Sequence, residues 1–128
     1  MFVIVWAFRP RPGREAEFER AYGPEGGWAG LFRQAPEYLG TDLFRAADGS
    51  GRHLTVDRWQ SREAYEAFRA ARRAEYEALD RTGEQLTASE EPLGDYVLAE
   101  PAAGAEWVGV RPFFDLMAKV CAFRREKP

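Results

Sequence analysis

The sequence is poor in the residues that build covalent cross-links and metal centres. Cys121 is the only cysteine and His53 the only histidine among the 128 residues, and asparagine is absent altogether. A single cysteine excludes an intrachain disulfide and a zinc site with several cysteine ligands, so a reducing, cytoplasmic setting is the simplest expectation. No metal site is predicted.

An excess of positive charge and a long hydrophobic run are also missing. The chain has 18 basic and 21 acidic side chains, for a formal net charge of -3, whereas a protein that binds nucleic acid by neutralising phosphates is expected to be basic. The apolar residues 1–8 lack a preceding basic segment and stop at Arg9 and Pro10, which makes them a poor signal peptide and too short a membrane span. We therefore expect neither nucleic acid nor a membrane as a partner.

The patterns that are present indicate one globular domain. Residues 2–9 are rich in β-branched and aromatic side chains and predict a strand. Residues 14–35 have apolar side chains at spacings of three and four, interrupted by glycines and a proline at 23–27, and predict a broken helix. Two antiparallel strands are expected at 38–46 and 52–60, because a short turn rich in glycine separates them.

A second helix and a last strand follow. Ser61 is a good N-cap for a helix that runs to Gly83 with aromatic residues on one face. Residues 84–92 are polar and predict a connection, before a strand at 93–99. The order β-α-β-β-α-β predicts an α+β, ferredoxin-like split βαβ fold, in which a four-stranded antiparallel sheet has both helices on one face.

The domain is expected to span residues 1–100. A linker rich in proline, alanine and glycine follows, and apolar residues then recur on one helical stripe. Residues 101–128 therefore predict a linker and an amphipathic helical extension.

With helices on one face, the other face of the predicted sheet has no cover. Residues 2–8 are apolar on both alternating sides, so this strand needs cover on both. A homodimer formed through the open faces of two sheets meets that need and is the expected assembly.

Residues 54–68, which read LTVDRWQSREAYEAF, resemble the strand-to-helix signature of the antibiotic biosynthesis monooxygenase (ABM) family. The first strand and the segments 36–40 and 92–96 are similar to that family too. The resemblance implies the dimeric α/β-barrel superfamily. It also implies a cofactor-independent monooxygenase that oxidises a phenolic or polycyclic aromatic small molecule to a quinone.

Three positions carry this functional implication. The quinone-forming members place a tryptophan at the end of the third strand and a phenol six residues later, which match Trp59 and Tyr65. Four residues before the tryptophan they have an asparagine, where this chain has Thr55. Their chemistry needs donors that hold a phenolate oxygen, and a hydroxyl donates one hydrogen bond where an amide both donates and accepts. A second hypothesis is therefore a non-catalytic dimeric module that binds an aromatic small molecule or a partner protein.

Haem degradation and cofactor-dependent oxidation are disfavoured. The haem-degrading members resemble one another in an asparagine on the first strand and a histidine on the second helix, and this chain has no asparagine and no histidine between Ser61 and Gly83. It also has no glycine-rich phosphate loop after a strand and no dinucleotide fingerprint. An oxygenase of this kind is expected to work without a cofactor.

His53 lies on the same strand parity as Thr55 and Trp59. If that side of the strand lines a pocket, His53 is a candidate base near neutral pH. The alternative is an exposed histidine at the start of the strand. Trp59 has a similar choice between a pocket wall and a structural wedge in the core.

Four further residues are candidate ligand contacts. Tyr22 and Trp28 flank the break in the first helix, where space opens over the sheet for a flat ligand. Arg72 and Tyr76 lie on the apolar stripe of the second helix, where Arg72 is placed to meet an anionic or phenolate group. The alternatives are aromatic caps on the core and a solvated, charged helix face.

Overall fold

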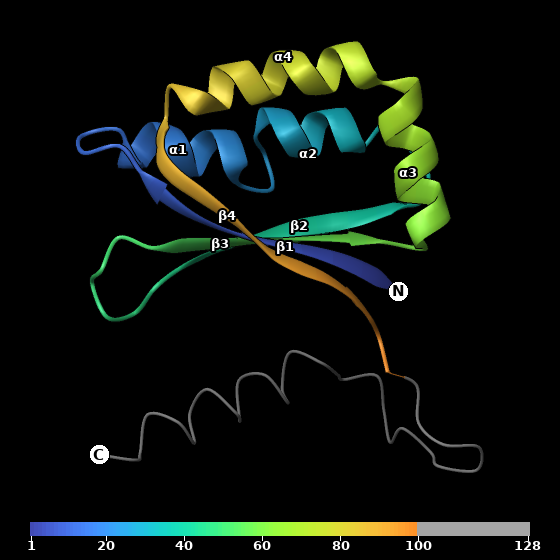
Figure 1. Cartoon of the computed structure of the whole chain (residues 1–128), viewed down its shortest axis with the longest axis horizontal. Helices are drawn as coiled ribbons and strands as arrows, with labels where there is room; N and C mark the ends of the chain where they lie inside the picture. Colours follow the sequence, from blue (N-terminus) through green and yellow to red (C-terminus); the bar gives the residue numbers. More distant parts are fainter. Residues whose placement is uncertain (100–128) are drawn as a thin grey trace. The chain divides into compact units, whose positions relative to one another are not determined.

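The computed structural model describes residues 1–99, which form a four-stranded antiparallel sheet with four helices on one of its faces (Figure 1). The elements follow the order β1 (Phe2–Pro10), α1 (Glu15–Tyr22), α2 (Gly27–Phe32), β2 (Tyr38–Arg45), β3 (His53–Trp59), α3 (Arg62–Ala71), α4 (Arg73–Glu84) and β4 (Thr87–Val97). The predicted α+β, ferredoxin-like fold is confirmed. The extension expected at 101–128 lies outside the described residues.

The strands are arranged in the order β2-β3-β1-β4, so that the apolar strand β1 is central. Ile4 pairs with Asp57 on β3 and with Asp95 on β4. Because side chains alternate along a strand, the residues of β1 that contact the helices are in register with every second residue of β3. The face toward the helices consists of Phe2, Ile4, Trp6 and Phe8 from β1, and of His53, Thr55, Asp57 and Trp59 from β3.

Each of the two expected helices is divided in two. Gly23 to Gly26 separate α1 from α2, as predicted, but the helix expected from Ser61 to Gly83 also breaks, at Arg72. The backbone of Arg72 has φ -116° and ψ 31° and serves as the last cap of α3 and the first of α4. Ser61 caps α3 as predicted, since its hydroxyl accepts a hydrogen bond of 3.1 Å from the amide of Ala64.

Strand β4 begins at Thr87, six residues earlier than the predicted start at 93. The polar segment that was expected to be a connection pairs with β1, from Pro10 opposite Thr87 onwards. The prediction was wrong because β4 is an edge strand, which is hydrogen-bonded on one side only and whose side chains are largely exposed. Such a strand needs no apolar alternation.

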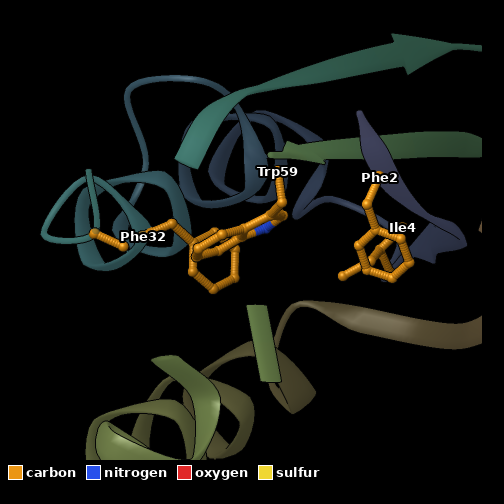
Figure 2. Close-up of a cluster of buried hydrophobic side chains, with 5 residues drawn as sticks. Phe2, Ile4, Phe32 and Trp59 are labelled. Atoms are coloured by element: carbon orange, nitrogen blue, oxygen red, sulfur yellow. The ribbon is translucent and has the colours of Figure 1, made fainter. Parts of the chain in front are cut away.

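The core between the sheet and the helices consists of two clusters. The first contains Phe2, Ile4, Phe32, Ala35 and Trp59, and Figure 2 shows Trp59 against Phe32 with Phe2 and Ile4 beside them. The second contains Phe8, Phe18, Tyr22 and Leu86. Two partly buried side chains, Trp6 and Trp28, pack against both clusters and therefore mark the space between them.

Within residues 1–99, all four helices lie on one side of the sheet, and none of them covers its other face (Figure 1). Its apolar side chains are in register across all four strands, with Phe44 opposite Leu54 and Tyr96 opposite Val3. Phe44 and Tyr96 are 49% and 54% exposed. Among the described helices, none is long and apolar enough to cross a membrane.

Candidate active site

A cavity of about 160 Å³ lies between the helices and the sheet. Its apolar walls are Ile4, Trp6, Phe8, Tyr22, Trp28, Phe32, Tyr65 and Tyr76, and its polar walls are Thr55, Asp57, Arg69, Asp80 and Glu90. An apolar cavity of about 150 Å³ binds benzene in another protein. This cavity therefore has room for about one aromatic ring, with exposed side chains such as Arg69 and Glu90 at its rim.

Five of the candidate residues meet in this cavity. Thr55, Tyr65, Tyr22, Trp28 and Tyr76 come from β3 and from four different helices and line the same space. Trp28 and Tyr76 are edge to face with ring centroids 4.8 Å apart, an arrangement that aromatic pairs favour. The break between α1 and α2 is what places Trp28 over the sheet beside Tyr22.

Trp59 does not line the cavity. It is fully buried in the first core cluster, with Phe32 at 5.4 Å and Tyr38 at 5.3 Å between ring centroids. Its indole N–H has no hydrogen-bond partner among residues 1–99. Because the ring of Tyr65 packs edge to face on Trp59 at 5.4 Å, Trp59 supports a cavity wall from behind, which favours the structural alternative for this residue.

His53 is buried rather than exposed, contrary to the alternative considered from the sequence, and it lies outside the cavity lining. Its Nδ1 is 2.9 Å from the carbonyl oxygen of Gly51 and its Nε2 is 2.7 Å from Oε2 of Glu19. Both ring nitrogens therefore face oxygen atoms of the protein, which only accept hydrogen bonds. In this arrangement neither nitrogen faces the cavity, so the structure does not place His53 as a base for a ligand there.

Arg72 also lies away from the cavity. It stands at the junction of α3 and α4, 42% exposed, with its guanidinium 3.8 Å from Glu75. Arg69, one turn earlier, lines the cavity instead, with its guanidinium 4.8 Å from the centroid of the Tyr76 ring. The break at Arg72 changes which residues of α3 and α4 face the sheet. A prediction that assumes one continuous helix from Ser61 to Gly83 cannot include this change.

Asp57 is a cavity residue that the sequence analysis did not single out. It lies on β3 between Thr55 and Trp59, and its Oδ1 accepts a hydrogen bond of 2.5 Å from the hydroxyl of Thr41 on β2. Burial raises the pKa of Asp57 to about 6, and the hydrogen bond from Thr41 opposes that rise. The available signal was strand parity, which puts Asp57 on the same face as Thr55.

Two tyrosines of the cavity, Tyr22 and Tyr65, are hydrogen-bond donors rather than bases. Burial raises the pKa of Tyr65 well above its usual range, and the neighbouring Tyr76 adds to that effect. Burial also raises the pKa of Tyr22 to about 12, against a hydrogen bond from Trp28. At the rim, the pKa of Glu90 is raised by burial and by the negative charges of Asp80 and Glu84. The phenols of Tyr22 and Tyr65 therefore stay protonated near neutral pH.

Comparisons with known structures agree with the fold. SnoaB, a cofactor-independent oxygenase from Streptomyces nogalater, matches with a TM-score of 0.58 and 20% identity, over 80% of this chain and 96% of SnoaB. An uncharacterized NIPSNAP domain protein from Burkholderia xenovorans matches with a TM-score of 0.57 and 20% identity, over 83% of this chain and 99% of that protein. At such identities the likeness concerns the fold.

The comparison with curated proteins gave no match. Within the described part of the chain, no group of three or more His, Cys, Asp and Glu side chains is placed to hold a metal ion. The profile described as antibiotic biosynthesis monooxygenase matches residues 1–79, more than half of the 128 residues. This match confirms the resemblance inferred from residues 54–68, and the chain belongs to the antibiotic biosynthesis monooxygenase family.

Proposed function

We propose that this protein is a cofactor-independent monooxygenase that oxidises a phenolic aromatic small molecule to a quinone. The observation that carries the proposal is the aromatic cavity, in which the hydroxyls of Thr55 and Tyr65 and the carboxyl of Asp57 share a space about one ring in size. The family membership and the SnoaB-like fold support the same class of reaction. A cytoplasmic location, expected from the single cysteine, belongs to this proposal.

The proposed reaction converts a phenol and O₂ to a quinone and water. The hydroxyl proton leaves first, and the phenolate gives one electron to O₂. Superoxide and the aryloxyl radical then combine at the ring carbon para to the oxygen, and the peroxide formed takes up a proton. Loss of the C–H proton from that carbon breaks the O–O bond, forms the second carbonyl and releases hydroxide, which becomes water by taking up a proton.

Donors that hold the phenolate oxygen make the first electron transfer easier, because they stabilise the charge that develops there. The hydroxyls of Thr55 and Tyr65 have this role in our proposal. Thr55 is 4% exposed on β3, and Tyr65 reaches the cavity from the first turn of α3, the helix that Ser61 caps. Since Thr55 provides one donor where other members have an amide, Tyr65 has the larger share of the task.

The size of the cavity limits which part of a substrate is enclosed. A volume of about 160 Å³ accepts one ring. We propose that the phenolic ring enters, and that any further rings of a polycyclic substrate extend past the rim at Arg69 and Glu90.

The test is O₂ uptake with a panel of anthrone, naphthol and simple phenol substrates, followed with an oxygen electrode and by mass spectrometry of the product. We expect enzyme-dependent uptake with one O₂ consumed per quinone, and no product under anaerobic conditions. Thr55→Val removes one donor at nearly constant shape and should lower the rate. Absence of enzyme-dependent uptake across the panel contradicts the proposal.

The second candidate is a non-catalytic module that binds an aromatic molecule. The observation that favours it is Thr55, which stands where the quinone-forming members have an asparagine. The same panel distinguishes the two functions. In a non-catalytic module, binding of an aromatic ligand should quench the fluorescence of Trp6 and Trp28 in the cavity, and no O₂ should be consumed. Native mass spectrometry of protein purified from its own cells would weigh a retained ligand directly.

We also propose that two copies pair through the open faces of their sheets. The apolar side chains there are Val3, Val5, Phe44, Leu54, Val56 and Tyr96. Removing apolar area from water is worth roughly 25 cal/mol per Å², so pairing stabilises these side chains more than scattered polar contacts. Sedimentation that gives a stable monomer of 14.5 kDa at micromolar concentration would contradict this assembly.

A further inference from the structure

Among the residues that line the cavity, Asp57 has the one carboxyl group on a central strand of the sheet. The other two carboxylates of the lining, Asp80 and Glu90, come from α4 and from the edge strand and are exposed. Within residues 1–99, Oδ1 of Asp57 accepts the hydrogen bond from Thr41 and Oδ2 has no hydrogen-bond partner. One oxygen of this carboxylate is therefore held in place while the other remains available to a ligand.

A chain of hydroxyls leads away from Asp57 across β2. The single proton of the Thr41 hydroxyl is donated to Asp57, so the hydrogen bond between Thr41 and Tyr38 has Tyr38 as its donor. Tyr38 is only partly buried. The chain Tyr38, Thr41, Asp57 thus connects the floor of the cavity with a side chain that reaches solvent.

This chain has a second orientation that moves a proton. Once Asp57 has taken up a proton on Oδ2, a half-turn of its carboxyl group brings that O–H to the oxygen of Thr41, while the Thr41 hydroxyl turns to donate to Tyr38 and the Tyr38 hydroxyl to water. Transfer of one proton along each of these three hydrogen bonds then releases a proton to solvent, returns Asp57 to its ionised form and restores the first orientation. The proton therefore reaches solvent through Thr41 and Tyr38, without passing the ligand in the cavity.

The charge state of Asp57 suits a base. Burial raises the pKa of its carboxyl to about 6, which makes it more basic than an ordinary aspartate, yet mostly ionised at neutral pH. A base is most effective when its pKa lies near the working pH. The phenols around it do not compete, since burial raises the pKa of Tyr22, Tyr38 and Tyr65.

The other charged and titratable groups in the cavity come from each element packed against Asp57. They are Tyr65 and Arg69 from α3, Tyr76 and Asp80 from α4, Tyr22 from α1 and Glu90 from β4. Glu90 is the one of these whose raised pKa requires an experimental distinction from Asp57. His53, on the same strand, is paired with Glu19 outside the lining.

We propose that Asp57 is the catalytic base of the oxygenase, and that Thr41 and Tyr38 are positioning residues that hold it and conduct its proton to solvent. The inference rests on the proposed function. In the step assigned to Asp57, Oδ2 removes the O–H proton of the bound phenol. The electron pair stays on the phenol oxygen as phenolate, and O₂ is the oxidant that accepts the electron in the next step.

The experiment measures O₂ uptake between pH 5 and 8 for the wild type and for Asp57→Asn, with the phenol that gives the fastest wild-type rate. The wild-type rate should fall below about pH 6, as Asp57 becomes protonated. Asp57→Asn should lower kcat by about 10²- to 10⁴-fold, the usual contribution of a general base, and should abolish this acid limb. An acid limb that persists in Asp57→Asn belongs to another group, such as Glu90, and overturns the proposal.

Asp95→Asn is the matched control, because Asp95 is opposite Ile4 on β4 as Asp57 is opposite Ile4 on β3. Asp95 lies outside the cavity lining, in an exposed pair with Arg62. Its variant should keep the wild-type rate and pH profile. If Asp57→Asn and Asp95→Asn have the same rate, Asp57 is not the base.

Thr41→Val provides a readout that does not require loss of the carboxyl. The hydrogen bond from Thr41 lowers the pKa of Asp57, so its removal should move the acid limb to higher pH. Tyr38→Phe keeps Asp57 and Thr41 and interrupts only the outer end of the chain, so it should increase the solvent isotope effect on kcat. An acid limb that stays in place in Thr41→Val contradicts the proposal even where Asp57→Asn fails to fold.

The two proposals fail in different ways. If the wild type takes up no O₂ with any phenol, the proposed function is wrong, and the role of Asp57 is excluded with it. If the wild type takes up O₂ while Asp57→Asn loses less than about tenfold in kcat, the function stands and only the assignment of the base is wrong.

Discussion

The hydroxyl of Tyr22 occupies the space that a side chain on Gly83 would need. A Cβ placed on Gly83 would stand 2.1 Å from that oxygen and 3.2 Å from the ring carbon that bears it. Gly83 is buried near the end of α4, and Tyr22 is held at the cavity by Phe18 and Phe8, with ring centroids at 4.5 and 4.8 Å. Because residue 83 has no side chain, Tyr22 has the space it needs to form part of the cavity wall.

Gly83→Ala should therefore destabilise the protein, although alanine favours a helix over glycine by about 1 kcal/mol. Overpacking of this kind costs about 1 to 3 kcal/mol, which thermal denaturation would detect. Combination with Tyr22→Phe removes the closest atom and should restore most of the loss. Strictly additive effects of the two changes would contradict this contact.

Asp57→Asn should stabilise the protein at neutral pH. The carboxyl ionises near pH 3.8 in the unfolded chain and near pH 6 in the folded one, so deprotonation between these values favours the unfolded state. Wild-type stability should fall as pH rises from about 4 to about 6, by about 1 to 3 kcal/mol, and the variant should lack that loss. Urea denaturation at several pH values measures it. Equal stabilities of both proteins at pH 7 would contradict the buried charge.

Glu19→Gln should weaken the protein at neutral pH and matter little in acid. Hydrogen bonds from Arg45 and His53 lower the pKa of Glu19 to about 2, so its stabilisation is complete above about pH 4.5 and is lost as pH falls toward 2. Because Arg45 is exposed, we expect a difference of about 1 to 2 kcal/mol rather than the full value of the shift. A difference from the wild type that is independent of pH between 2 and 6 would count against this pair.

Tyr65→Phe should lower turnover and leave stability nearly unchanged. The variant removes one hydroxyl from the cavity and keeps the ring that packs on Trp59. Loss of a hydrogen bond of about 1 kcal/mol corresponds to roughly a fivefold lower kcat/KM. Unchanged binding and turnover with any phenol that the wild type oxidises would remove Tyr65 from the site.

Trp59→Phe should instead lower the stability of the protein more than its turnover. Trp59 is fully buried among aromatic rings and its N–H has no partner within residues 1–99, so the variant loses packing and no hydrogen bond. A cavity of this kind costs on the order of 1 to 3 kcal/mol, and the melting temperature should fall accordingly. A loss of turnover larger than that of Tyr65→Phe, at unchanged melting temperature, would place Trp59 in the chemistry instead.

The fold could be predicted from the sequence because its signals are local. The signals of Ser61, of the glycines in the turns and of the apolar run in β1 each act within a few residues, and strand parity alone placed Thr55 and Trp59 on one face. The helical periodicity of residues 61–83 gave a wrong result because the helix breaks at Arg72. As a consequence Arg69, and not the predicted Arg72, lines the cavity. The edge strand β4 escaped prediction because an exposed edge needs no apolar side chains.

The site depends more on contacts between distant residues. His53 can be buried because Glu19, which is 34 residues earlier in the sequence, provides a hydrogen-bond partner at 2.7 Å. Asp57 differs from a surface aspartate only through Thr41 and the helices above it. Neither partner is visible in the pattern of a single segment, so these electrostatic properties required the three-dimensional structure.

The early start of β4 also has a consequence for how the protein resists aggregation. The outer edge of a sheet is a template for further strands unless charge, proline or a bulge disturbs it. Along β4 the register shifts twice, Pro92 has no N–H to offer, and Glu90, Glu91 and Asp95 bring negative charge. A second molecule therefore finds no regular edge to extend there, and fibrous growth through this strand is opposed at high concentration.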